Sequence, residues 1–236
     1  MHYHVGTSGY QYRHWRERFY PADIPQRRWL AYYAEHFDSV EINATFYRLP
    51  ELDKIRRWCE EVPEDFRFVP KFSRYGSHIK RLKDPSASIG PFREIVEAMG
   101  DQLGAVLLQL PPNWRAQPER LDAFLAEAHW PWAVELRDPR WLCDEVFEVL
   151  GRHNAALCLT DGTADQHWRL TADWSYLRFH GSEHTEPMGE TRRQRWTDWL
   201  RRTLPGQGGA WVFFNNDGDA RAPFDARAFR DTLAAA

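Results

Sequence analysis

Cysteine is scarce in this sequence, and its three cysteines lie far apart. Cys59, Cys143 and Cys158 show neither the even number of a disulfide framework nor the paired spacing of a zinc site. Proteins of reducing compartments rarely contain disulfides. We therefore expect a reduced, cytoplasmic protein.

Long hydrophobic runs are also missing. No run of about eighteen apolar residues, the length that indicates a membrane-spanning helix, occurs in the chain. Residues 1–10 lead directly into a strand-like run and lack the apolar segment of a secretory signal peptide. These absences predict a soluble protein that is not exported and has no membrane partner.

A strong charge of one sign is absent as well, since the formal net charge is -3. The chain as a whole is therefore not drawn to nucleic acid or to anionic membranes. A local exception is the loop 71–83, in which cations alternate with the aromatic residues Phe72 and Tyr75. Its basic residues are Lys71, Arg74, His78, Lys80, Arg81 and Lys83. Such a loop suits a phosphate backbone, although loop cations more often only face solvent.

Strand-like and helix-like segments alternate along the chain. Eight runs rich in β-branched and aromatic residues cover residues 3–6, 39–43, 66–71, 105–110, 133–136, 156–159, 176–179 and 211–214. Apolar stripes at helical spacing are Leu30, Tyr33, Ala34, Phe37; Phe92, Ile95, Val96, Met99, Leu103; Leu121, Phe124, Leu125, Ala128; and Trp196, Trp199, Leu200, Leu204. Strands separated by single helices require right-handed parallel crossovers, and eight such units favour an α/β fold, the TIM-type (β/α)₈ barrel.

The length of 236 residues and the hydrophobic content of 43% suit one such barrel, so we expect a single domain over residues 1–236. An open doubly wound sheet is the alternative. It is less favoured because no glycine-rich phosphate fingerprint follows the first strand. Residues 161–174 lack a clear apolar stripe, which predicts an irregular or shortened helix between strands 6 and 7.

Polar side chains stand where the apolar runs end. These residues are Glu41 and Asn43, Lys71, Gln109, Glu135 and Arg137, Arg178 and His180, and Asn215 to Asp217. The carboxyl ends of parallel strands meet at one rim of a barrel, where barrel enzymes hold their active sites. Because side chains alternate along a strand, Glu41 and Asn43 share one face. We interpret this rim as the candidate site, with a structural ion-pair network as the alternative.

Metal binding at this rim is a rival interpretation. Glu41, Glu135, Asp161 and His180 form a mixed carboxylate and imidazole set that divalent ions accept. The set is sparse, Arg137 stands beside Glu135, and neither a His-rich cluster nor an HExxH spacing is present. We therefore assign no metal ligands, and a divalent cofactor stays a disfavoured alternative. A Schiff base on Lys71 is another conceivable chemistry.

Several ordered motifs run from one end of the chain to the other. They are Gly6-Thr7-Ser8-Gly9-Tyr10 with Tyr12 and Trp15, Phe19-Tyr20-Pro21, Val40-Glu41-Ile42-Asn43 leading to Thr45-Phe46-Tyr47-Arg48-Leu49-Pro50, Gln109-Leu110-Pro111-Pro112, Glu135-Leu136-Arg137, Arg178-Phe179-His180-Gly181 and Phe214-Asn215-Asn216. Together they resemble the YecE-like family of the domain of unknown function 72. The resemblance implies a TIM-type barrel and no catalytic roles, because that family carries no established reaction. One departure is the loop 182–190, where the family often has a basic residue and then a tyrosine.

The sequence thus predicts an enzyme, of hydrolase or lyase type, that uses acid–base chemistry on a small anionic substrate, phosphorylated or nucleotide-like. Glu41 and Glu135 are the candidate acid and base, with His180 as a proton shuttle. Arg137, Arg178 and Lys71 would clamp the anion, and Asn43, Gln109 and Asn215 would orient it. Further candidate substrate-binding residues are Thr7, Ser8, Tyr47, His78 and Asn216.

Two other functions stay open at this point. One is a nucleic-acid-binding protein, or a metal-dependent protein that processes nucleic acid, with the rim and the loop 71–83 as its contact surface. The other is a ligand sensor that binds without catalysis. The sequence does not predict an oligomeric state.

Overall fold

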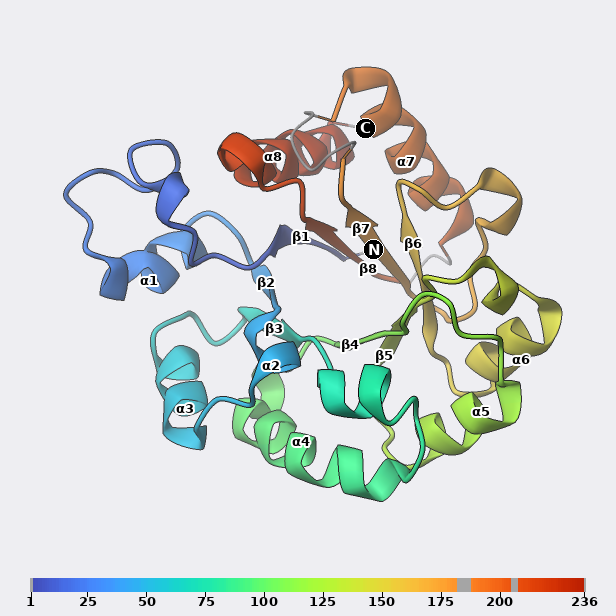
Figure 1. Cartoon of the computed structure of the whole chain (residues 1–236). Coiled ribbons are helices and arrows are strands. Elements are labelled where there is room, and N and C mark those ends of the chain that lie inside the picture. The colour runs from blue at the N-terminus through green and yellow to red at the C-terminus, as the bar shows by residue number, and fades with distance from the viewer. Residues whose placement is uncertain (1, 182–187, 205–207, 236) are drawn as a thin grey trace.

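Eight parallel strands form the centre of the computed structural model, which describes residues 2–181, 188–204 and 208–235 (Figure 1). The strands are β1 (Tyr3–Ser8), β2 (Ser39–Ile42), β3 (Arg67–Pro70), β4 (Val106–Gln109), β5 (Trp132–Glu135), β6 (Ala156–Thr160), β7 (Ser175–Phe179) and β8 (Ala210–Phe214). Their order around the sheet is β3-β2-β1-β8-β7-β6-β5-β4, so the first strand lies between the second and the last. All eight runs proposed from the sequence are strands.

The sheet closes between β3 and β4 through two isolated bridges rather than a continuous ladder. The amide of Gly104 donates to the carbonyl of Phe68 at 2.8 Å, and the amide of Phe72 donates to the carbonyl of Leu107 at 2.8 Å. The other neighbouring pairs form parallel ladders. The predicted (β/α)₈ barrel is therefore confirmed, with β3 and β4 as its most weakly joined pair.

Helices surround the strands and cover their outer faces (Figure 1). They are α1 (Trp29–Ala34), α2 (Ala44–Tyr47), α3 (Leu52–Glu60), α4 (Pro85–Met99), α5 (Pro118–Ala126), α6 (Asp144–Arg152), α7 (Glu190–Thr203) and α8 (Arg221–Ala234). Short 3₁₀ helices are η1 (Arg13–Trp15), η2 (Gln26–Arg28), η4 (Gly100–Gln102), η5 (Pro139–Trp141), η6 (Asp165–His167) and η8 (Gly218–Ala220), and η3 (Tyr75–Ile79) is a π-helical turn. The four apolar stripes named above belong to α1, α4, α5 and α7.

The connection from β6 to β7 contains only the turn η6, which confirms the shortened helix predicted there. Trp168, which follows this turn, stacks on Trp196 of α7 with ring centroids 3.7 Å apart. The indole of Trp168 also donates to the carbonyl of Thr163 at 2.8 Å. An aromatic contact thus covers part of the surface that a helix covers in the other units.

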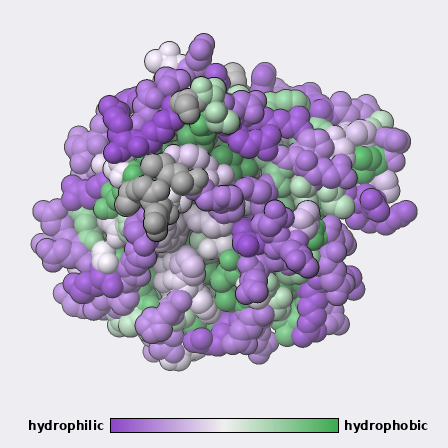
Figure 2. Space-filling model, turned by 180° about the vertical axis from the view of Figure 1, so that it is seen from behind, coloured by the Kyte–Doolittle hydropathy of each residue, from purple (hydrophilic) through white to green (hydrophobic). Residues whose placement is uncertain are grey.

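The strands carry apolar side chains on both faces, as buried parallel strands do. Residues that fill the barrel interior are Val69, Ala105, Leu107, Ala133, Ala156, Cys158, Tyr176 and Phe213. Alternate residues such as Val40, Leu108 and Val212 belong to the larger core under the helices. On the face opposite to that of Figure 1, hydrophilic residues predominate and hydrophobic ones lie in scattered small patches (Figure 2). None of the helices within the described ranges has the length and hydrophobicity that crossing a membrane requires.

Close packing of β1 against β2 leads to a first prediction. A Cβ on Gly6 would lie 2.2 Å from the carbonyl oxygen of Ser39, which is backbone and cannot move without breaking the sheet. We expect Gly6→Ala to lower the free energy of unfolding by about 2 kcal/mol and Tm by about 5 °C. The same substitution at Gly151 in α6 meets only an ordinary contact at 3.8 Å, so it should be neutral or stabilise by up to about 1 kcal/mol. Equal urea midpoints for the two variants would contradict this packing.

Candidate functional site at the carboxyl ends of the strands

A buried arginine stands at the centre of the rim. Arg178 of β7 is 2% exposed and lies between carboxylates of two other strands. It donates to Oε1 of Glu41 at 2.8 Å and to Oε2 of Glu135 at 2.5 Å. The second oxygen of Glu41 accepts the hydroxyl hydrogen of Tyr176 at 2.6 Å. Both carboxylate oxygens of Glu41 are therefore engaged, and the residue positions Arg178 and Tyr176.

Glu135 continues the network toward solvent. Its Oε1 lies 2.7 Å from Nε of Arg137, whose side chain is 45% exposed, and 3.9 Å from Nε2 of His180. Burial alone would raise the pKa of Glu135, but the positive charges of Arg178 and Arg137 outweigh burial and lower the pKa to about 2. Glu135 is consequently a carboxylate at neutral pH, not a proton donor.

His180 follows β7 and is held by amide and carboxylate groups. The side-chain amide of Asn215 donates to Nδ1 of His180 at 3.0 Å, so the ring proton belongs on Nε2. Asp161 accepts the backbone amides of His180 and Gly181 at 3.2 and 2.7 Å, which fixes the start of the next loop. Burial and the charge of Arg178 lower the pKa of His180 to about 4. The imidazole is therefore neutral at pH 7 and can donate a hydrogen bond.

Lys71 is the third cation of the rim and differs from the two arginines. Its ammonium group is buried, donates to Oε1 of Gln109 at 2.9 Å and lies 4.3 Å from the centre of the Phe46 ring. Among the described residues, no carboxylate forms an ion pair with it. Burial and the repulsion of Arg178 lower the pKa of Lys71 to about 8. Lys71 is thus a buried cation that retains unused hydrogen-bond donors.

Two small polar groups line the rim beside β2. Ser8 ends β1, pairs in register with Glu41 and is buried on the same inner face. Its Oγ has no hydrogen-bond partner within the described part of the chain, and the same holds for Oδ1 of Asn43. The amide nitrogen of Asn43 lies 3.4 Å from the carbonyl of Ser8. Buried polar atoms without partners are rare, and a bound ligand is one way to satisfy them.

Some residues proposed from the sequence lie elsewhere, and their placement corrects those expectations. Thr7 points outward, where it bonds to the hydroxyl of Tyr33 at 2.9 Å. Asn216 donates to Asp225 of α8 at 2.6 Å, also on the outer side. Tyr47 stays on the rim side, after β2, but its side chain is 79% exposed and not part of the buried site. Thr7 faces outward because its neighbour in β1, Ser8, faces inward, and adjacent residues of a strand point in opposite directions.

His78 lies at the edge of the rim. Its ring and the ammonium group of Lys71 contact the same Phe46 ring, and the Phe46 and His78 centroids are 5.0 Å apart. Nδ1 of His78 is 2.9 Å from the hydroxyl of Ser77. Burial and the charges of Lys71 and Arg74 lower the pKa of His78 to about 4. The loop residues 182–187, where the sequence departs from the family pattern, lie outside the described residues.

Sequence reasoning missed three contributors. Tyr176 stands two residues before Arg178, so strand alternation alone places both side chains on the inner face. Phe46 was expected to stack on a ligand or to cover the barrel, and its contact with the ammonium group of Lys71 was not foreseen. Tyr12 follows the first strand, and its hydroxyl donates to the carbonyl of Ser8 at 2.5 Å, which no sequence pattern indicated.

The position of Arg178 argues against a metal ion between Glu41 and Glu135. A cation shared by Glu41 and Glu135 would have to occupy the space between their carboxylates. The guanidinium of Arg178 already fills that space with a positive charge. The donor set of the rim therefore does not fit a bridging metal ion, because two cations would compete for the same oxygens.

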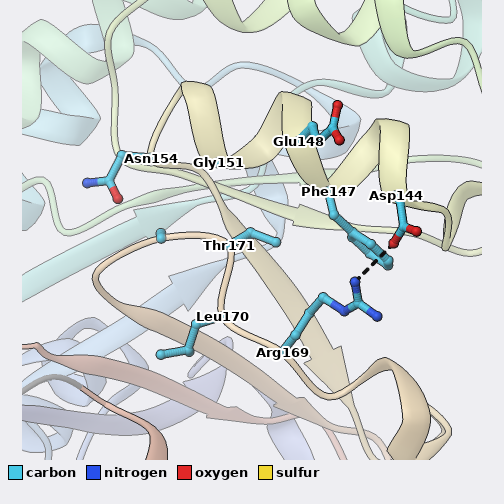
Figure 3. Close-up of a pocket in the computed structure, with 9 residues that line it drawn as sticks. Asp144, Phe147, Glu148, Gly151, Asn154, Arg169, Leu170 and Thr171 are labelled. Carbon is cyan, nitrogen blue, oxygen red and sulfur yellow. Dashed lines mark hydrogen bonds and ion pairs between the residues drawn. The ribbon is translucent and has the colours of Figure 1, made fainter.

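Cavities lie both at the rim and away from it. A small one of about 170 Å³ opens beside Asn43 and is also lined by Tyr12 and Trp58. A larger cavity of about 670 Å³ lies outside the barrel mouth, between α6 and the segment before β7. Figure 3 shows Arg169 directed toward Asp144 in this larger cavity, at 3.3 Å. The lining of the larger cavity contains no rim residue, whereas that of the smaller one contains Asn43.

Comparisons with known proteins agree on the relationship of the chain. The curated UPF0759 protein YecE of Escherichia coli K12 is 33% identical over 117 residues, which cover 48% of this chain and 42% of that protein. UPF0759 protein YunF of Bacillus subtilis is 24% identical over 151 residues, which cover 56% of this chain and 50% of that protein. These alignments thus span about half the length of the curated relatives or less.

Solved structures show the same fold over the full length. A DUF72 family protein of Thermotoga maritima superposes with a TM-score of 0.82 at 23% identity, covering 99% of this chain and 100% of that one. A DUF72 family protein of Enterococcus faecalis gives a TM-score of 0.77 at 17% identity, covering 99% of this chain and 96% of that one. The family model described as "Protein of unknown function DUF72" matches residues 4–236. The chain therefore belongs to the DUF72 family.

Proposed function

We propose that this protein is an enzyme that acts on a small anionic substrate at the carboxyl-terminal rim of the barrel. The observation that carries the proposal is Lys71, a buried ammonium group without a carboxylate partner among the described residues. The carboxylates of Glu41 and Glu135 act on Lys71 but form their ion pairs with Arg178 and Arg137. Three cations thus share two carboxylates, and the buried rim keeps an unfavourable excess of positive charge. An anionic ligand would remove that excess and use the free donors of Lys71, which supports a binding role.

The neighbouring groups complete a site for such an anion. Nε of Arg137 contacts Oε1 of Glu135, and the half-exposed side chain of Arg137 leaves the other guanidinium nitrogens available to a ligand. Oγ of Ser8 and Oδ1 of Asn43 are buried polar atoms without partners in the described part of the chain, and Asn43 also lines the small cavity. The Nε2 hydrogen of His180 adds a neutral donor. We infer that Lys71 and Arg137 bind the charged group while Ser8, Asn43 and His180 orient the rest of the substrate.

The acid and base roles differ from those expected from the sequence. Both oxygens of Glu41 already accept hydrogen bonds from Arg178 and Tyr176, and Glu135, with its pKa lowered to about 2, does not donate a proton at neutral pH. The group whose pKa, about 8, lies nearest to neutral pH is Lys71. General acid–base catalysis is most effective when the pKa of the group is near the working pH. We therefore propose Lys71 as the proton-transferring residue and the two glutamates as the residues that hold the arginines.

A second candidate function is nucleic-acid binding through the loop 71–83. Tyr75 is 46% exposed, and the ammonium group of Lys80 lies 5.6 Å from the centre of its ring. Tyr47, also exposed, follows the neighbouring strand on the same side of the barrel. Exposed aromatic rings beside cations are suited to stack bases and contact phosphates. The second function would use the same rim with a longer ligand.

One binding experiment separates the two functions. We expect a sugar phosphate and a mononucleotide to bind the wild type, and Lys71→Met to weaken that binding about tenfold or more. Arg56→Met is the control, because Arg56 is an exposed cation of α3 that pairs with Asp53. Calorimetric titration at two salt concentrations gives both affinity and salt dependence. Equal affinities in the two variants would refute the proposed site, whereas tight binding of only a single-stranded oligonucleotide with a steep salt dependence would establish the second function.

A further inference from the structure

Two histidines and an aspartate meet at the opposite, amino-terminal end of the barrel. His2 precedes β1 and His4 lies in it, so alternation places both rings on the same side. Asp38 directly precedes β2, the neighbouring strand. Its Oδ2 lies 3.1 Å from Nδ1 of His4 and 3.8 Å from Nε2 of His2. The three ligand-type atoms all lie within 4.8 Å of one another, the one such group of three among the residues that the structure describes.

Neighbouring groups hold two of these side chains in place. The ring of His4 stacks on Trp211 with centroids 4.0 Å apart and an interplanar angle of 9°. The second oxygen of Asp38 accepts the hydroxyl of the buried Ser39 at 3.1 Å. The backbone carbonyl of Asp38 accepts the amide of Arg67 at 2.9 Å, which ties the residue to the start of β3. Orientation of ligands by such outer contacts is characteristic of metal sites.

The spacing of the donor atoms fits a small divalent ion. In a tetrahedral site with bonds of about 2.0 to 2.1 Å, neighbouring donor atoms are roughly 3.4 Å apart. The two distances to Asp38 lie on either side of that value. Two imidazoles and one carboxylate are ligands that Zn²⁺ accepts, with a fourth position for water. His2 is exposed, so an ion and water can reach the site.

Competing charges nearby are few. Arg67, whose charge acts on His2, donates through its guanidinium to the carbonyls of Glu64 and Phe66. A plain hydrogen bond between His4 and Asp38 would explain those two residues. That hydrogen bond would not explain why Nε2 of His2 also lies near Oδ2 of Asp38.

We propose that His2, His4 and Asp38 bind a divalent ion of the zinc class. The ion would join the start of β1 to the start of β2, at the end of the barrel opposite to the proposed substrate site. The bound ion would hold the segment before β1 against the sheet. The proposal is independent of the function proposed for the rim.

Zinc titration of a chelator-treated protein without a histidine tag tests the proposal. In competition with a chromophoric chelator, we expect one equivalent of Zn²⁺ to bind the wild type and to raise its Tm by about 5 °C at a hundredfold excess over Kd. His4→Ala and Asp38→Asn should each weaken binding at least about tenfold. Asp38→Asn also keeps the volume of the side chain, so the test stands if His4→Ala fails to fold.

His14→Ala is the control, because His14 is an exposed histidine that follows β1 at the opposite end of the barrel. Its zinc affinity and thermal shift should equal those of the wild type. Zinc affinity of the same strength in Asp38→Asn and the wild type would overturn the proposal. So would a wild type that binds no zinc in this assay.

Discussion

Arg178→Met is expected to lower the free energy of unfolding by about 3 to 5 kcal/mol, because it leaves two buried carboxylates without their shared cation. Glu41 and Glu135 are both almost completely buried, and each lies within 2.8 Å of the Arg178 guanidinium. For a chain of this length the corresponding fall in Tm is about 10 °C. Urea unfolding followed by tryptophan fluorescence measures the change.

Two further variants make this result specific. Arg56→Met removes an arginine from the exposed ion pair with Asp53 and should cost less than about 1 kcal/mol. Combining Arg178→Met with Glu41→Gln and Glu135→Gln removes the uncompensated charges, so we expect it to recover about half of the loss or more. A triple variant no more stable than Arg178→Met would show that charge burial is not the cause. A loss as small as that of Arg56→Met would show that the network contributes little.

We expect low pH to decrease the free energy of unfolding of the wild type, because Glu135 becomes protonated. This is the second large expected effect. The unfolded chain protonates this carboxyl near pH 4.5, whereas the folded protein does so only near pH 2. The stability from Glu135 is thus fully present above about pH 5 and is lost as the pH falls toward 2. The shift corresponds to about 3 kcal/mol. We expect Glu135→Gln to flatten this part of the stability curve.

The slope of the curve is the quantity to compare, because Glu135→Gln also changes the absolute stability. Glu97→Gln, at an exposed position of α4, serves as the control and should keep the slope of the wild type. Urea unfolding at half-unit intervals from pH 6 to pH 2.5 gives the slopes. If the Glu135→Gln curve runs parallel to that of the wild type, Glu135 is not held ionised by the arginines.

Much of the fold could be predicted from the sequence because both of its periodicities are strong. The strand-like runs carry β-branched and aromatic residues without interruption, and all eight form strands. The helices α3, α6 and α8 were not among the named stripes. In α3 only Ile55 and Trp58 are buried, which gives too short a pattern to recognise with certainty. The incomplete pairing of β3 with β4 depends on tertiary packing, so no pattern in the sequence indicates it.

For the candidate site, strand alternation predicted positions better than roles. Glu41, Glu135 and Arg178 meet at the rim as expected from their places at strand ends. Their pairing could not be deduced, because it depends on distances between strands that are far apart in sequence. Proton affinities followed from that pairing, which is why Lys71 rather than Glu135 became the candidate for proton transfer. The group at His2 could not be recognised from the sequence because its third member, Asp38, precedes the next strand and stands 34 residues after His4.

The weak junction between β3 and β4 has a consequence for how the mouth of the barrel can open. The bond from Lys71 to Gln109 crosses this junction, since the two residues stand at the ends of β3 and β4. An anion that draws the ammonium group away from Gln109 would break this side-chain hydrogen bond. β3 and β4 would then be joined only by the isolated backbone bridges described above. Binding of the anion and widening of the barrel mouth between β3 and β4 would then occur together, because Lys71 takes part in both.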